Sequence, residues 1–184
     1  FFLQEERYLY RADPGADLDL VALSEPLAVG AHAVRRVHQA RPNLVKEKVL
    51  VLGGGAIGLS CLFALKVLEG CEYVELYDLV EERVAKAVAA GAASPTDVAA
   101  AGGDGDAAGY GGLYSGRGYD AIFETSASPA AFRTALGLLR PLGTVMALGF
   151  IPSVELGLKQ VTFKAAQIMG SIGGTGEFDR VLEF

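Results

Sequence analysis

The chain is poor in the residues that mark several functional classes. Among its 184 residues there is no tryptophan, and cysteine, methionine and histidine each occur twice. Cys61 and Cys71 fit no spacing typical of metal ligands, so the sequence predicts neither a cysteine-rich zinc site nor a disulfide framework. We interpret both as reduced thiols in or near the core of a cytoplasmic protein.

Long apolar runs and basic clusters are also missing. No tract of about 18 uninterrupted apolar residues occurs, as a membrane-spanning helix would need. The net charge is −6 and no Lys/Arg-rich run is present, so we expect neither nucleic acid nor an anionic membrane as a partner. A small anionic ligand held by backbone amides needs no such patch. With 51% hydrophobic residues, the chain can bury a large core.

The two ends of the sequence do not look like natural domain ends. The chain opens with Phe1-Phe2-Leu3, without an initiator methionine or the basic start of a signal peptide, and we expect residues upstream. The other end stops inside a helical pattern over 177–184, so we expect the chain to continue there too. Residues 1–24 are predicted to form a connecting arm with at most one short strand, and 25–184 a single α/β domain.

A glycine cluster between a strand and a helix is the most informative feature. The run 48–52 has no charge after Lys48, which is typical of a strand buried on both faces. Gly53, Gly55 and Gly58 follow it in the GxGxxG spacing of dinucleotide-binding turns. The first permits a tight turn, the second lets phosphates approach the backbone, and the third lets the helix pack close to the strand. The helix start then offers N–H groups and a positive dipole end to the phosphates.

Asp78 makes this motif more specific. It stands twenty positions after Gly58, at the end of the apolar segment 73–78, where a second strand would bring a carboxylate to the adenosine ribose. A carboxylate there would accept bonds from the ribose hydroxyls and repel a 2′-phosphate, which predicts NAD over NADP. The alternative is an N-cap for the helix 81–90. S-adenosylmethionine methyltransferases share this layout but usually carry an acid just before the glycines, where this chain has Val51 and Leu52.

Strand and helix patterns alternate from Lys48 onward, which predicts a Rossmann-type doubly wound parallel sheet. A helix over 27–39, opened by Pro26, precedes the sheet. We expect a helix-poor link before the last strand, a poorly defined helix at 96–101 and a surface loop over 102–118. The predicted strands are 48–52, 73–78, a short one near Ala93, 119–124, 144–148 and 167–172; the predicted helices are 56–69, 81–90, 129–140 and 177–184.

Several segments together resemble the medium-chain dehydrogenase/reductase superfamily, in particular its zinc-dependent alcohol and polyol dehydrogenase branch. The chain is similar to the coenzyme-binding domain of such enzymes, and residues 1–24 would then be an arm left from the catalytic domain. The segments that carry the resemblance are 24–34, 49–58, 78–83, 119–126, 140–145 and 164–170.

The resemblance implies a cofactor site and an interface. Arg83 would reach the ribose, although it could equally be a solvated helix cation paired with a nearby glutamate. The strand 167–172 would pair with its copy in a homo-oligomer. The implied NAD-binding residues form four groups. Gly53, Gly55, Ala56, Ile57 and Gly58 would lie in the glycine turn, and Asp78 and Arg83 at the ribose. Ser126 and Ala127 would lie by the adenine, and Leu148, Gly149 and Phe150 by the nicotinamide.

The chain departs from that family in its metal ligands. Full-length members carry an upstream domain with a Cys and a His-Glu pair, and this chain has none of them. By resemblance Glu25 would bind or approach zinc in the intact parent, but it also suits a helix entry before Pro26. His32 and His38 are six positions apart and do not share a helix face, so we expect them to pack or face solvent.

The resemblance implies hydride transfer between an alcohol or polyol and NAD in the intact parent, with zinc polarising the substrate oxygen. The fragment alone should bind the cofactor without catalysing the reaction. Two alternatives remain at this point: a stand-alone dinucleotide-binding module that senses redox state, and a zinc-free quinone or enoyl reductase. Asp78 argues against the second, because those reductases commonly use NADP.

Overall fold

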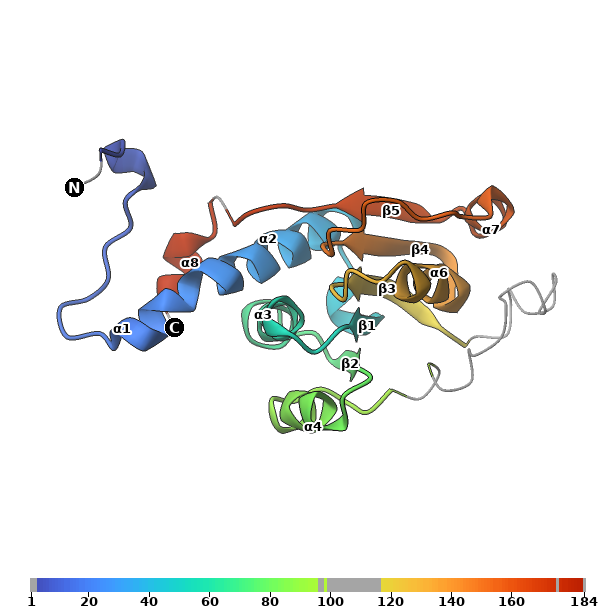
Figure 1. Ribbon diagram of the computed structural model, residues 1–184, viewed down its shortest axis with the longest axis horizontal. Coiled ribbons are helices and arrows are strands. Elements are labelled where there is room, and N and C mark those ends of the chain that lie inside the picture. The colour runs from blue at the N-terminus through green and yellow to red at the C-terminus, as the bar shows by residue number, and fades with distance from the viewer. Residues whose placement is uncertain (1–2, 96–97, 99–116, 175, 184) are drawn as a thin grey trace.

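A computed structural model describes residues 3–95, 98, 117–174 and 176–183. Its centre is a five-stranded sheet in the order β2-β1-β3-β4-β5, in which every neighbouring pair is parallel (Figure 1). The sheet confirms the predicted fold class. The strands are β1 (Lys48–Leu52), β2 (Tyr73–Tyr77), β3 (Tyr119–Glu124), β4 (Leu139–Ala147) and β5 (Gln167–Gly170).

The central strands are buried on both faces. In β1, Val49 and Val51 join one apolar cluster and Leu50 and Leu52 join the other, as the alternation of side chains along a strand requires. Side chains of the helices α2 (Ser24–Ala40) and α3 (Ala56–Phe63) belong to the first cluster. Side chains of α6 (Pro129–Leu138) belong to the second. Helices therefore cover both faces of the sheet, which explains the uninterrupted apolar sequence of β1.

The remaining helices are short. η3 (Ala64–Leu68) is a π-helical continuation of α3, where one uninterrupted helix was predicted. α4 (Glu81–Ala89) follows β2, as expected. α7 (Leu158–Lys164) precedes β5, and α8 (Phe178–Leu182) lies near the C-terminus. None of the helices within the described ranges is long and apolar enough to cross a membrane.

A short segment at Ala93 extends the sheet beyond β2. Ala93 forms an isolated parallel bridge with Glu75, and its N–H donates a 2.8 Å hydrogen bond to the Val74 carbonyl. This segment was predicted as a short strand, and it supplies the position next to β2 that a Rossmann sheet fills. The helix predicted over 96–101, apart from Val98, and most of the loop over 102–118 lie outside the described residues.

The N-terminal arm, predicted to hold at most one short strand, contains two short helices. η1 (Glu6–Tyr8) and α1 (Leu18–Ala22) are its regular elements within residues 3–23. The side chain of Asp17 accepts a 2.9 Å hydrogen bond from the Asp19 N–H and thereby caps α1. The arm runs along one end of the molecule (Figure 1).

The structure differs from the prediction at two further places. The residues between the predicted helix 129–140 and the predicted strand 144–148 lie inside β4, where Leu142 has a positive φ of 62° and the register to β3 shifts. The link before β5 was predicted to be helix-poor but contains α7. Lys164 at the end of α7 donates hydrogen bonds of 2.6 and 2.7 Å to the carbonyls of Leu136 and Gly137. This tertiary contact, which the local sequence does not reveal, anchors α7 to the end of α6.

Candidate functional site

The predicted cofactor residues gather at one edge of the sheet. Because all strands are parallel, their carboxyl ends lie together, and the chain leaves them at Gly53, Asp78, Thr125 and Leu148. The connection from β1 leads to β2 on one side, and the connection from β3 leads to β4 on the other. The boundary between β1 and β3 is thus the topological switch point, where doubly wound sheets bind ligands.

The glycine turn is shaped by close packing at two of its glycines. Gly53 has φ +105°, which a residue with a side chain rarely adopts, and its N–H donates a 2.9 Å bond to the Tyr77 carbonyl. A Cβ on Gly58 would lie 1.8 Å from the Gly53 oxygen. Helix α3 can therefore meet the end of β1 only because residue 58 has no side chain, as the sequence predicted.

Gly55 differs from these two glycines. Its φ is −77°, and no heavy atom of the described residues lies within 4 Å of a Cβ built on it. It is the N-cap of α3 and has no side chain to accept hydrogen bonds from the first turn of the helix. Ala56 next to it is exposed and Ile57 is half-buried. The turn therefore presents an open helix N-terminus.

Asp78 lies beside the turn and is held by backbone amides. Its Oδ2 accepts a 2.7 Å hydrogen bond from the Gly54 N–H, and its Oδ1 accepts a 2.8 Å bond from the Val80 N–H. Burial tends to raise the pKa of this carboxyl, but these two hydrogen bonds and the nearby Arg83 guanidinium bring the pKa below its usual value. The N-cap of α4 is Val80, so Asp78 does not have the capping role that was its alternative.

Arg83 approaches Asp78 from the first turn of α4. Its NH1 lies 3.4 Å from Asp78 Oδ2, and its side chain is about half exposed. The guanidinium is therefore beside the carboxylate predicted to bind ribose, rather than paired with a glutamate of its own helix. A partly exposed pair at this distance contributes little to stability, so the Arg83 guanidinium is available to a ligand.

Two residues that the sequence did not single out hold the next part of the site. Thr125 donates its hydroxyl toward the carbonyls of Leu52 and Gly53, at 2.9 and 3.0 Å. Glu124 is fully buried, and its Oε1 accepts hydrogen bonds from the N–H and the hydroxyl of Ser126. A carboxylate directly after the apolar run 121–123 was the available signal for Glu124. Thr125 has no comparable sequence signal.

The predicted adenine and nicotinamide segments touch each other at this edge. The N–H groups of Leu148 and Gly149 donate to the Glu124 carbonyl at 2.9 and 3.1 Å. A Cβ on Gly149 would lie 2.5 Å from the nitrogen of Ala127, a residue with a left-handed φ of 57°. Phe150 projects into solvent and is 82% exposed. The structure thus brings together the residues that the resemblance implied.

The described residues do not by themselves fit a zinc site. Glu25 lies exposed in the first turn of α2, and no group of three or more His, Cys, Asp or Glu side chains within the described ranges could hold a metal. His32 is hydrogen-bonded to the Ser171 hydroxyl, and His38 pairs with Glu69. Both histidines are half-buried packing residues, as predicted.

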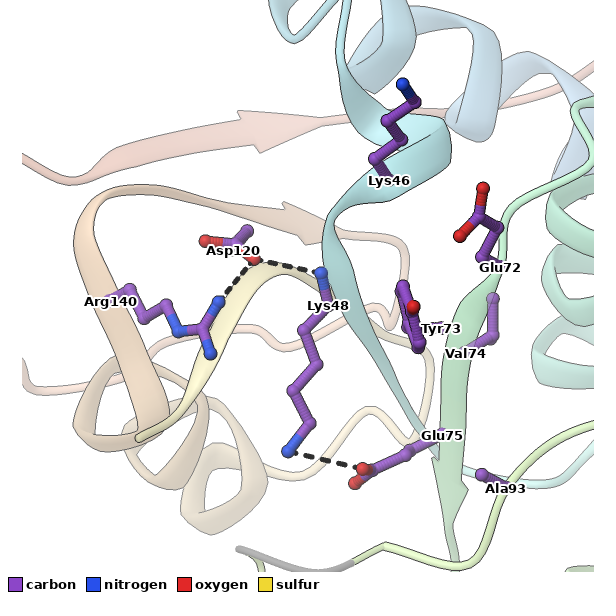
Figure 2. Close-up of a pocket in the computed structure, with 9 residues that line it drawn as sticks. All are labelled: Lys46, Lys48, Glu72, Tyr73, Val74, Glu75, Ala93, Asp120 and Arg140. Carbon is purple, nitrogen blue, oxygen red and sulfur yellow. Dashed lines mark hydrogen bonds and ion pairs between the residues drawn. The ribbon is translucent and has the colours of Figure 1, made fainter. Parts of the chain in front are cut away.

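A pocket of about 310 Å³ lies at the opposite edge of the sheet, where the strands begin (Figure 2). Asp120 in its wall accepts hydrogen bonds from the Lys48 N–H at 2.9 Å and from Arg140 at 2.7 Å. The ammonium of Lys48 is 3.2 Å from Glu75 Oε1. These charges pair with one another, so the pocket walls form an ion-pair network that ties the strand starts together, away from the glycine turn.

Comparisons with known proteins agree with this geometry. The sequence model of the family described as "Zinc-binding dehydrogenase" matches residues 56–184, more than half of the chain. Sorbitol dehydrogenase of Bos taurus is 38% identical over 92 residues, which are 50% of this chain and 24% of that protein.

Solved dehydrogenase structures are also similar to this chain. A zinc-binding dehydrogenase of Sinorhizobium meliloti, solved with NADP, has a TM-score of 0.77 and 26% identity over 95% of this chain and 50% of its own. An alcohol dehydrogenase of Escherichia coli CFT073, solved with NADH, has a TM-score of 0.75 and 22% identity over 95% of this chain and 49% of its own. The chain spans about half the length of these structures. The chain belongs to the zinc-binding dehydrogenase family of the medium-chain dehydrogenase/reductase superfamily, and its fold is that of the family's nucleotide-binding domain.

Proposed function

We propose that this chain is the NAD(H)-binding domain of an alcohol or polyol dehydrogenase. The pyrophosphate would lie over the glycine turn, against the N–H groups that begin α3. Asp78 and Arg83 would hold the adenosine ribose, and Ser126 and Ala127 would line the adenine side. Leu148, Gly149 and Phe150 would face the nicotinamide. These assignments use residues from four strand ends that meet at the switch point.

The observation that carries the proposal is the open space at Gly55. Gly53 and Gly58 are required by the chain's own geometry, but nothing in the described residues requires a glycine at 55. Gly55 has an ordinary φ and room for a side chain, and it forms the N-cap of α3, where a residue with a side-chain acceptor would stabilise the helix. A ligand that closely approaches the backbone here would explain why residue 55 has no side chain.

Asp78 supports NAD rather than NADP. Its carboxylate lies beside the glycine turn in a charged state that two amide hydrogen bonds favour. A 2′-phosphate placed near it would meet like charge, whereas ribose hydroxyls would donate to it. Relatives of this fold have been solved with NADP and with NADH, so the preference must come from local residues such as this one.

The whole protein would transfer hydride between the carbon of a small alcohol or polyol and the nicotinamide, which is the chemistry that the bound cofactor supplies. The residues described here would bind and orient that cofactor. Because they form no metal site, we propose that this chain alone does not oxidise alcohols, and that Glu25 would be at most one of several zinc ligands in the intact parent. The identity of the alcohol depends on residues elsewhere.

A second copy of the chain is the proposed partner at β5. This strand is at the edge of the sheet, with Ile168 45% exposed and Ile172, just beyond it, 74% exposed. Unpaired edge strands with apolar side chains invite pairing. Sedimentation equilibrium should show a dimer or a larger homo-oligomer. Ile168→Pro should shift it toward monomer, because N–H directions alternate along a strand and the N–H of Ile168 lies on the free side, whereas the Ser171 N–H bonds inward to Ala147.

A thermal-melting experiment tests the binding function. A ligand that binds only the folded state at about 100 times its Kd adds about 2.7 kcal/mol to the free energy of unfolding. NADH should therefore raise the melting temperature of the chain in a concentration-dependent way, and a polyol such as sorbitol alone should not. An unchanged melting temperature at millimolar NADH would refute the proposed function.

A further inference from the structure

Glu124 is a buried carboxylate at the centre of the cofactor edge. It ends β3, and its side chain is fully buried. Its main-chain oxygen accepts the N–H groups of Leu148 and Gly149, and its Oε1 accepts two hydrogen bonds from Ser126. One residue therefore joins the loop after β3 to the loop after β4, the two segments proposed to lie along the cofactor.

The second carboxylate oxygen of Glu124 is unusual. Among the described residues no donor reaches Oε2, although this atom is buried. It faces residue 149, because a Cβ built on Gly149 would lie 2.7 Å from it. Burying a charged oxygen without a partner costs free energy, and such a group in a folded protein calls for an explanation.

The other buried carboxylate of the sheet shows the contrast. Glu75 in β2 has one oxygen beside the Lys48 ammonium at 3.2 Å and the other bonded to the Tyr119 hydroxyl, at the pocket of Figure 2. Its charge is therefore balanced locally. Glu124 has hydrogen-bond donors on one oxygen, and within the described ranges no cation pairs with it.

We propose that Glu124 is a positioning residue that places an uncompensated negative charge under the nicotinamide end of the site and so favours the oxidised cofactor. The inference rests on the proposed function, since it requires a dinucleotide over Gly149. The oxidised nicotinamide ring carries a positive charge and the reduced ring carries none. A buried charge is weakly screened, so it stabilises the oxidised form selectively.

The affinity ratio for NAD+ and NADH tests this proposal. Both dissociation constants are measured by isothermal titration for the wild type, for Glu124→Gln and for Glu75→Gln. Glu124→Gln should weaken NAD+ binding about five- to tenfold and change NADH binding by less than about twofold, because only the oxidised ring loses a charge interaction. Glu75→Gln removes the same charge at the far edge and should leave the ratio unchanged.

A purely structural role predicts a different result. If Glu124 only held the two loops together, Glu124→Gln would weaken both cofactors equally or neither, and the proposal would be overturned. Glu124→Met, which needs no hydrogen-bond partner, is the second variant should the first fail to fold. Failure of both to fold would also overturn the proposal in favour of a structural role. No binding of either cofactor by the wild type would instead refute the dinucleotide site itself.

Discussion

The N–H of Gly54 donates a 2.7 Å hydrogen bond to Oδ2 of Asp78. This bond connects the turn after β1 to the end of β2, two segments that are twenty-four positions apart in the chain. It means that the residue proposed to select the cofactor also helps to shape the turn proposed to bind its phosphates. Changes at Asp78 should therefore affect stability as well as specificity.

Asp78→Asn should destabilise the fold in a pH-dependent way. The pKa of Asp78 is lowered in the folded state, so its contribution is fully present above the pKa of the unfolded chain, about 3.9, and is lost as the pH falls through the folded-state value. At pH 7 we expect a loss of about 1 kcal/mol, since the amide accepts weaker hydrogen bonds than the carboxylate. Urea unfolding of both proteins between pH 7 and pH 2.5 measures this difference. A difference that stays constant across that range would contradict the account.

Alanine at Gly58 should mainly affect stability, and alanine at Gly55 should mainly affect cofactor binding. Gly58→Ala would place a Cβ 1.8 Å from the Gly53 oxygen and should cost about 3 kcal/mol or more, because backbone atoms would have to move. Gly55→Ala meets no described atom, so it should change stability by no more than about 1 kcal/mol, because the smaller freedom of the unfolded chain and the poorer N-cap act in opposite directions. It should nevertheless weaken NADH binding at least about tenfold if phosphates contact this backbone.

Thermal melting and NADH titration of the two variants separate these effects. Equal NADH affinity in Gly55→Ala and the wild type would show that the phosphates do not approach residue 55. A stable, unperturbed Gly58→Ala variant would show that the packing of α3 on the turn is not as tight as the structure indicates.

Both cysteines should be unreactive in the folded protein. Cys61 and Cys71 are buried free thiols, and burial raises the pKa of Cys61 to about 12. Burial, with the charge of Glu69, raises the pKa of Cys71 to about 11. At pH 8 the reactive thiolate is therefore scarce. A thiol reagent such as Ellman's reagent should label neither cysteine in the native chain and both in 6 M guanidinium; rapid native labelling would contradict the buried positions.

The fold could be predicted largely from local sequence because its strands are buried on both faces. The runs 49–52 and 121–123 are apolar over their length, and each is followed by a polar or glycine-rich segment. Such runs have few alternatives in an α/β chain. The candidate site was predictable for the same reason, since parallel strands gather their carboxyl ends at one edge.

The features that were missed depend on contacts between distant segments. α7 is anchored by the Lys164 bonds to the end of α6, and the positive φ of Leu142 occurs where β4 shifts register against β3. Thr125 contributes through hydrogen bonds to carbonyls more than seventy positions away. Neither propensity nor periodicity encodes these contacts, so the sequence alone could not place them.

Asp78 and the glycine turn are proposed to form a site for NAD in particular. Isothermal titration of the wild-type chain with NADH and with NADPH measures this preference. We expect NADH to bind and NADPH to bind at least about tenfold more weakly, because the 2′-phosphate would lie beside a charged carboxylate. Equal affinities, or tighter binding of NADPH, would contradict the claim.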